Sequence, residues 1–442
     1  MTRPYALCIA LTLALGFVPA VLGAQASGHP VVDSASVARA AWARMNAARR
    51  ANDLGTARAE ALRAATEWPT QPAYQWARAA LAARASDTAG TLAGLRAYAA
   101  LGLGRDLASD PAIAALRGAP GFDAVSAAHD RNRAPVARGT VLRQTTDSTL
   151  WPEGVDHDPR AGDFYVASVR RRTIVRIAAD GATRELWPSG ARDLGALLGV
   201  RLDAARQRIW ATTSGLKQTD GYVPADSAIA ALLRIDARTG RIERRWDLPV
   251  VTGGHVLGDV ALGPAGEVYV TDSNEPVLYR LRHDADTLDR FRHPLFRGLQ
   301  GMAVTPDGRF LYVADYAHGL LRVRMSDGEV VRLADAPGST SLGCDGIVLH
   351  QGAIVAVQNG VAPARIVRFA LDAAGDAIVE ARVLDQQPAL APEPTIGAIV
   401  ANRFVYVANS QWETYDGEGR RRPGVPLTGA RLIAVPVEDG TR

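Results

Sequence analysis

Six residues recur at the start of similar apolar strands, and several of them could bind a cation. They are Glu153, Leu198, Gly258 with Asp259 beside it, Gln300, Asp345 and Thr395. Three carboxylates and an amide around one opening repel one another unless a cation neutralises them. Oxygen ligands of this kind favour a hard ion, Ca²⁺ above Mg²⁺ or Mn²⁺. The alternative is that these are ordinary residues at strand starts, solvated by a channel.

The elements that would position these residues form a repeat. Typical units are "GDVALGPAGEVYVTDSNEPVLYRL" from 258 and "QGMAVTPDGRFLYVADYAHGLLRV" from 300, each an apolar strand, a turn, an aromatic-rich strand and a strand carrying Arg. Six such units start 42 to 60 residues apart, which predicts six four-stranded blades of a β-propeller. The innermost strands of a propeller line its channel, so the six residues should meet at one mouth. Because the turn "GPAG" is one residue shorter than the others, Asp259 is the least secure member.

The two ends of the repeat region predict how the ring closes. The segment "TVLRQTTDSTL", residues 140 to 150, precedes the first unit, and "RLIAVPVED", residues 431 to 439, supplies only the third strand of the last unit. We expect the first segment to be the outer strand of the final blade, because this pairing removes the open edge between the first and last blades.

Three strings carry a resemblance to a known family. The strings "PEGVDHDPRAGDFYV", "QGMAVTPDGRFLYVADY" and "GCDGIVLHQGAIVAVQNG" are similar to those of the senescence marker protein, gluconolactonase and luciferin-regenerating enzyme family, over roughly residues 138 to 440. The resemblance implies a six-bladed propeller with a central divalent metal, held by a Glu of the first blade, an Asn of the fourth and an Asp of the fifth, and it implies lactone hydrolysis.

The resemblance also implies roles for single residues. Glu153 and Asp345 match the metal-binding Glu and Asp, while Gln300 stands at the Asn position with its amide on a longer stem. Gly258 occupies the place of a substrate-contacting Asn, for which the neighbouring Asp259 could substitute. Thr395 completes the mouth as a further residue facing the substrate.

The implied mechanism is metal-assisted ester hydrolysis. The cation would polarise the lactone carbonyl, and Asp345, or a water that it orients, would act as the base. His255, in "TGGHVLGD", lies just before the third inner strand and could shuttle a proton from the rim, although a His in such a Gly-rich connector is commonly a turn residue. The chain has no G-x-S-x-G motif, so serine catalysis finds no support.

Two other functions fit the same residues. The first is a non-catalytic propeller with a structural metal, which binds a small molecule or a protein partner. The second is a sensor for a sugar or polyphenol ligand in the channel. The segment "TSGLKQTDGYVPADSAIAALLRI" of the second unit is the long insertion expected to supply a lid over the mouth, as an enzyme of this kind requires.

The first 26 residues have the pattern of a secretory signal. Arg3 precedes an apolar stretch, and Ala24, Gln25 and Ala26 form a small-x-small cleavage site. We expect a bacterial periplasmic or secreted protein with no membrane span after cleavage; an uncleaved anchor is the alternative.

Residues 33 to 132 predict a small α-helical domain. They are rich in Ala, Leu and Arg, and Trp42 and Trp76 lie 34 residues apart, a period that resembles tetratricopeptide repeats. The segment either binds a protein partner or packs only on itself. The net charge of +4 comes from 50 basic and 46 acidic residues spread along the chain, so nothing indicates a nucleic-acid partner.

Overall fold

A computed structural model describes residues 34–187, 191 and 193–438 of the chain, which divides into two compact units with the boundary between Arg133 and Ala134. The predicted signal segment, residues 1–26, lies outside the described residues. Among the helices that the structure describes, none combines the length and apolar character needed to cross a membrane.

The first unit is built from helices that pack in antiparallel pairs. The elements are α1 (Ser34–Arg50), α2 (Leu54–Glu67), α3 (Pro72–Arg84), α4 (Thr88–Ala99), η1 (Leu107–Ser109), α5 (Pro111–Ala114) and α6 (Phe122–Arg133). Asp53 and Asp87 cap α2 and α4 by accepting hydrogen bonds from the amides of Thr56 and Gly90. These two breaks end the first helix of each pair, as the 34-residue period predicts.

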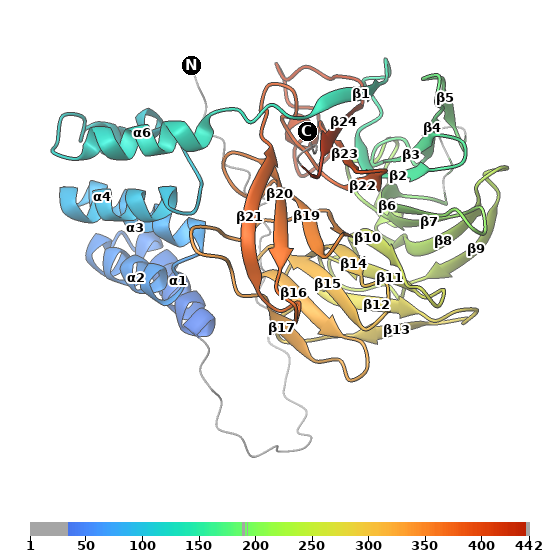
Figure 1. The fold of residues 1–442 in the computed structure, drawn as a ribbon, viewed down its shortest axis with the longest axis horizontal. Coiled ribbons are helices and arrows are strands. Elements are labelled where there is room, and N and C mark those ends of the chain that lie inside the picture. The colour runs from blue at the N-terminus through green and yellow to red at the C-terminus, as the bar shows by residue number, and fades with distance from the viewer. Residues whose placement is uncertain (1–33, 188–190, 192, 439–442) are drawn as a thin grey trace. The chain divides into compact units, whose positions relative to one another are not determined.

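The second unit is a six-bladed β-propeller, as predicted from the sequence (Figure 1). In the described residues it contains six antiparallel four-stranded sheets. Blade 1 has β2 (Pro152–Asp158), β3 (Asp163–Ser168), β4 (Ile174–Ile177) and β5 (Thr183–Glu185); blade 2 has β6 (Ala196–Asp203), β7 (Arg208–Ser214), β8 (Ala230–Asp236) and β9 (Ile242–Asp247); blade 3 has β10 (Leu257–Leu262), β11 (Val268–Asp272), β12 (Val277–Leu281) and β13 (Leu288–Phe291). Blade 4 has β14 (Leu299–Val304), β15 (Phe310–Asp315), β16 (Gly319–Arg324) and β17 (Val330–Arg332); blade 5 has β18 (Ile347–His350), β19 (Ala353–Gln358), β20 (Arg365–Leu371) and β21 (Ile378–Asp385).

The sixth blade joins the two ends of the propeller chain. Its sheet runs β22 (Gly397–Val400), β23 (Arg403–Val407), β24 (Arg431–Pro436) and β1 (Thr140–Gln144), and Figure 1 shows β1 beside β24. Thr140 lies opposite Ala434 and Gln144 opposite Arg431 in this antiparallel pair. The prediction that the N-terminal strand closes the ring is therefore confirmed.

Apolar side chains fill the spaces between blades. Each pair of neighbouring blades has its own buried cluster, and the cluster between blades 6 and 1 includes Phe164, Val166, Val405 and Leu432. Because each blade is covered on both faces, strands such as β3 and β19 are buried along their whole length. The innermost strands contact one another in sequence around the ring, and β22 returns to β2. This packing fixes the starts of six strands around one opening.

Candidate metal centre at the propeller mouth

A β-bulge places the predicted residues at equivalent positions. The register shifts between Pro152 and Val155 in β2, and equivalent shifts occur in β6, β10 and β14. Blades 5 and 6 repeat the pattern just before β18 and β22, where the amides of Asp345 and Thr395 donate to the carbonyls of Val357 and Val407 at 2.8 and 3.0 Å. The first bulge residues are Glu153, Leu198, Gly258, Gln300, Asp345 and Thr395. A bulge turns such a side chain out of the regular alternation.

The second bulge residue explains why Glu153 is followed by glycine. A Cβ at Gly154 would overlap the carbonyl oxygen of Leu198 in the next blade. Likewise, a Cβ at Gly301 would lie 2.6 Å from the Asp345 carbonyl oxygen, and one at Gly346 would lie 2.7 Å from the Cα of Ile396. In blades 1, 2, 4 and 5 the innermost strands thus approach the neighbouring backbone so closely that only a glycine fits at the second bulge position.

The Thr395 hydroxyl lies between the two principal carboxylates. Its Oγ1 is 3.0 Å from Oε1 of Glu153 and 2.9 Å from Oδ2 of Asp345. All three residues are buried, with Glu153 and Asp345 each 9% exposed. A hydroxyl has one proton to donate, so it can stabilise only one of two ionised carboxylates at a time.

The electrostatics of this pair favour a bound proton or cation. Burial raises the pKa of the Glu153 carboxyl, and the nearby Asp345 carboxylate raises it further, against the opposing effect of its hydrogen-bond donors. Burial also raises the pKa of Asp345, although hydrogen bonds from Thr395 and Asn359 work in the other direction. Two buried carboxylates that resist ionisation together form a site where a divalent cation would replace the missing positive charge.

Asp345 is held by a chain of polar side chains. The Asn359 amide donates to Oδ2 of Asp345 at 2.7 Å and to the carbonyl of Pro394 at 3.0 Å. The Tyr316 hydroxyl donates to the Asn359 Oδ1. Since Asn359 and Thr395 both converge on Oδ2, Oδ1 is the oxygen left to face an ion or a substrate.

Trp412 holds the other carboxylate. Its indole Nε1 donates to Oε2 of Glu153 at 2.7 Å. Sequence reasoning missed Trp412, Asn359 and Tyr316. Asn359 and Tyr316 each directly follow a second strand, β19 and β15, in "VQNG" and "VADY", and Trp412 follows a strand in "ANSQW". That shared position after a second strand is the signal that could have found them.

The geometry of Gln300 and Gly258 is complementary. The Gln300 side-chain Oε1 lies 4.0 Å from where a Cβ on Gly258 would be. A side chain at position 258 would therefore lie beside the Gln300 amide. Glycine leaves that space to the Gln300 side chain, which is one methylene longer than that of Asn. The glycine of blade 3 thus makes room at the mouth for the longer side chain of Gln300 in blade 4.

Asp259 lies beside the mouth position of blade 3. The bulge makes Gly258, not Asp259, the equivalent of Glu153, and Asp259 takes the second bulge position. Its carboxylate accepts hydrogen bonds from the amides of Val260 at 2.8 Å and Met302 at 3.3 Å, and it lies 3.4 Å from the Arg201 guanidinium. Burial raises the pKa of Asp259, and Arg201 opposes that shift. Asp259 thus has the Arg201 guanidinium and two backbone amides as partners, and its role as a metal ligand stays a prediction.

His255 is occupied by structural partners. Its Nδ1 lies 2.5 Å from Oδ2 of Asp272 and its Nε2 lies 2.8 Å from the carbonyl of Pro249. Burial opposes the charged form, but these two acceptors outweigh it and raise the pKa of His255. Both nitrogens therefore carry protons that point at acceptors, and a proton shuttle would have to leave both partners. His255, Asp272 and Glu275 also lie within metal-binding distance of one another, and His255 would have to release a proton before it could bind a metal there.

Two insertions meet above the mouth, where the sequence predicted one. Residues 215–229 connect β7 to β8, and residues 408–430 connect β23 to β24. Lys217 of the first insertion binds the Glu418 carboxylate of the second at 2.8 Å, and a Cβ at Gly419 would overlap the Lys217 backbone. The insertion of blade 6 carries Trp412, so the roof contacts the site directly.

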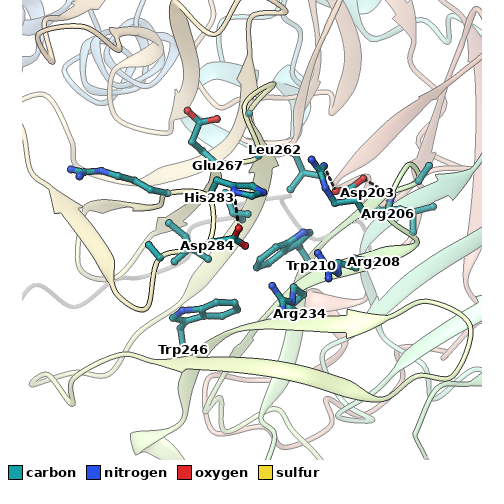
Figure 2. A pocket seen from close by; sticks show the side chains of 18 residues that line it. Asp203, Arg206, Arg208, Trp210, Arg234, Trp246, Leu262, Glu267, His283 and Asp284 are labelled. Carbon is teal, nitrogen blue, oxygen red and sulfur yellow. Dashed lines mark hydrogen bonds and ion pairs between the residues drawn. The ribbon is translucent and has the colours of Figure 1, made fainter.

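A separate pocket of about 240 Å³ lies between blades 2 and 3 (Figure 2). It contains the Trp210 and Trp246 rings, which stack with their centroids 5.5 Å apart. Its arginines are paired: Arg206 with Asp203 at 2.9 Å, for example. None of the six mouth residues lines this pocket. This pocket is therefore separate from the mouth, where the two buried carboxylates lie.

The comparison with protein families agrees with this site. The chain matches the family described as "SMP-30/Gluconolactonase/LRE-like region" over residues 151–389, which include Glu153, Gln300 and Asp345. The protein is a member of that family. A search of curated proteins found no match.

Solved structures with a similar fold include two related by name to this family. A gluconolactonase from Xanthomonas campestris is 17% identical, with 70% of this chain and 93% of that chain covered and a TM-score of 0.45. The calcium-binding protein regucalcin from Agrobacterium tumefaciens is 16% identical, with 67% and 95% covered and a TM-score of 0.44. A virginiamycin B lyase from Staphylococcus aureus is 18% identical, with 61% and 80% covered and a TM-score of 0.43. These likenesses concern the fold alone.

Proposed function

We propose that this protein is an exported, metal-dependent hydrolase of the lactonase or esterase type. The observation that carries the proposal is the buried pair Glu153 and Asp345, both within 3.0 Å of the one hydroxyl of Thr395. Burying two such carboxylates together lowers the stability of the fold, and strongly perturbed groups of this kind are typical of functional sites. Membership of a family whose description includes gluconolactonase supports the same reaction class.

The donor set fits a hard divalent cation, and we propose Ca²⁺. Glu153, Gln300 and Asp345 offer carboxylate and amide oxygens from three different innermost strands or their starts. When bound, the cation would supply the positive charge that polarises an ester carbonyl. Asp259 is left out of this ligand set because Arg201 already neutralises it.

The residues around the site would orient its two carboxylates. Trp412 fixes Glu153 through Oε2, and Asn359 with Thr395 fixes Asp345 through Oδ2. Asp345 would then accept a proton from an attacking water at Oδ1, the base role in ester hydrolysis. Gly258 leaves room for the Gln300 side chain beside the place where we propose that the substrate binds. We do not carry His255 into this mechanism, because both of its nitrogens are engaged.

A binding propeller with a structural ion is the second candidate. It is favoured by the low exposure of the mouth carboxylates, 9% each, under a roof that already contacts Glu153. In that case the ion would stabilise the folded ring and a small molecule or protein partner would bind elsewhere. The helical unit, residues 33–132 in the sequence prediction, is the proposed place for a protein partner.

Asp345→Asn separates the two candidates. The change keeps an oxygen ligand but removes the base, so a hydrolase should lose about 10² to 10⁴ in turnover while keeping part of its metal affinity. A binding propeller should show only lower metal affinity and a lower melting temperature. Metal analysis of the purified wild type and a panel of lactones and esters supply the baseline. If the metal-loaded wild type hydrolyses none of them, the enzyme proposal fails.

Export and the leader are proposed from the sequence. Residues 1–26 have the pattern of a secretory signal, and a periplasmic or secreted location would follow from its cleavage. N-terminal sequencing of the protein recovered from the periplasm or medium of a bacterial host tests this proposal, which predicts a start close to residue 27.

A further inference from the structure

One side of the mouth is apolar. Leu198 occupies in blade 2 the bulge position that Glu153 occupies in blade 1, and it is 3% exposed. It belongs to a buried cluster with Trp151 and Tyr415, against which Val256 and Trp412 pack. The rings of Trp151 and Tyr415 stack at 4.4 Å, and Trp412 meets Trp151 edge to face at 5.0 Å. The side formed by blades 1 and 2 and the roof is thus an aromatic and aliphatic wall.

The polar groups of the mouth are already committed. Trp412 directs its indole N–H to Glu153, and Asn359 directs its amide N–H to Asp345. The Thr395 hydroxyl lies between these two carboxylates, and Tyr316 directs its hydroxyl to Asn359. A substrate ring bound over the carboxylates would therefore meet few free donors or acceptors beside Gln300 and the indole N–H of Trp151, which is buried without a hydrogen-bond partner among the described residues. Each substrate hydroxyl placed against the Leu198 wall would lose its water without gaining a partner.

We infer that the substrate of this centre is a lactone or ester with an apolar body, alkyl or aryl, and not a polyhydroxylated sugar lactone. The inference rests on the proposed hydrolase function and adds the substrate class to it. Leu198 is the specificity-determining residue, and the wall around it buries the part of the substrate that does not react. Burial of apolar surface beside a water-excluded ester would supply the binding energy.

The wild-type protein tests the substrate class directly. With the metal-loaded full chain, kcat/KM is measured for δ-decalactone and for glucono-δ-lactone, which share the same ester ring. The alkyl lactone should be favoured by at least about 100-fold, since each unpaired hydroxyl costs roughly 10-fold. A preference for the sugar lactone would overturn the inference and leave the hydrolase proposal standing. Hydrolysis of neither would instead overturn the hydrolase proposal.

A binding measurement keeps the substrate class testable without turnover. The lactams corresponding to the two lactones keep the ring shape and resist hydrolysis, so calorimetry with each reports the ligand class alone. Tighter binding of the alkyl lactam supports the inference. Equal binding, or tighter binding of the polyhydroxylated lactam, overturns it.

The variant Leu198→Asn tests the residue, with Leu262→Asn as its matched control. Leu262 is the last residue of β10, partly buried, and it is not a mouth residue. Leu198→Asn should lower the ratio of alkyl to sugar kcat/KM by about 10-fold or more with Ca²⁺ affinity unchanged. Leu262→Asn should leave that ratio as in the wild type. If Leu198→Asn folds and keeps the wild-type ratio, Leu198 does not set specificity. If it fails to fold, Leu198→Val replaces it and should shift the ratio in the same direction by a smaller factor. An unchanged ratio in Leu198→Val refutes the role.

Discussion

A single hydroxyl shared by two carboxylates sets the chemistry of the mouth. Thr395 can donate to Glu153 or to Asp345 but not to both, so the pair lacks one donor when both carboxylates are ionised, and a proton or a cation would make up for it. Burial and mutual repulsion raise the pKa of Glu153, and burial raises that of Asp345. Metal and protons should therefore compete for the same two groups.

The competition predicts how metal removal changes stability with pH. A carboxyl whose pKa is raised in the folded state destabilises that state as pH rises above its unfolded value of about 4. In the metal-free protein this cost grows from about pH 5 to about pH 8, whereas bound metal removes it. We expect a chelator to lower the melting temperature more at about pH 8 than at about pH 5. Scanning calorimetry with and without Ca²⁺ measures the difference, and an equal effect at both pH values would contradict the account.

His255 predicts a second, opposite pH dependence. Its pKa is raised in the folded state, so its contribution to stability is complete below the unfolded value of about 6.5 and is lost as pH rises through the folded pKa. His255→Gln should cost about 1.5–3 kcal/mol at low pH, the worth of a hydrogen bond to a charged group, and less at high pH. The control is His283→Gln, at a half-exposed histidine. Denaturant unfolding of the wild type and both variants below and above about pH 6.5 measures this difference. A loss of stability in His255→Gln that does not change with pH would mean that His255 is neutral in the folded state, and it would refute the charged pair with Asp272.

Sequence reasoning could identify Glu153, Gln300 and Asp345 as equivalent because they start similar strands. It did not identify Trp412, Asn359 or Tyr316, because none of them starts a strand, and Trp412 and Tyr316 act on residues of the next blade. It also left Gly258 and Asp259 open, because a bulge adds a residue that strand alternation alone does not reveal.

At the scale of the strand, the glycine at the second bulge position of blades 1, 2, 4 and 5 controls how close the innermost strands come. Gly154→Ala would press a methyl group onto the Leu198 backbone, and we expect a loss of about 1–3 kcal/mol of stability together with weaker metal binding. Gly417→Ala, in a loop with no atom within 4 Å of the added carbon, is the control. Thermal unfolding of both variants measures the difference. Equal melting temperatures would mean that the close approach of the strands at Gly154 does not contribute to stability.

The closing strand gives a prediction about truncation. A chain starting at residue 134 keeps β1 and should fold into a soluble propeller, whereas one starting at 152 exposes the edge of β24 and should be unstable or aggregate. Circular dichroism and size-exclusion chromatography distinguish the two fragments. A fragment 152–442 as stable as fragment 134–442 would refute the role of β1 in closure.

At the scale of the molecule, the sequence was sufficient for the architecture because the signals repeat. Six similar units predict six blades, and the spare strands at each end predict how they join. The helical unit was visible from the spacing of Trp42 and Trp76, which lie in α1 and α3. The roof was only half predicted. The insertion of blade 6, residues 408–430, lies inside the last unit, so it did not widen any interval between the starts of two units.

Calorimetric titration of metal-free protein with Ca²⁺ tests the central claim most directly, namely that Glu153 and Asp345 form a cation site at the mouth. The wild type should bind about one ion per chain, and Glu153→Gln/Asp345→Asn should weaken binding by about 100-fold or more, because it removes both charged ligands. The matched control Asp272→Asn/Glu275→Gln removes two carboxylates beside His255 and should bind the ion as the wild type does. Wild-type affinity in the Glu153/Asp345 variant, or its loss only in the control, would contradict the account.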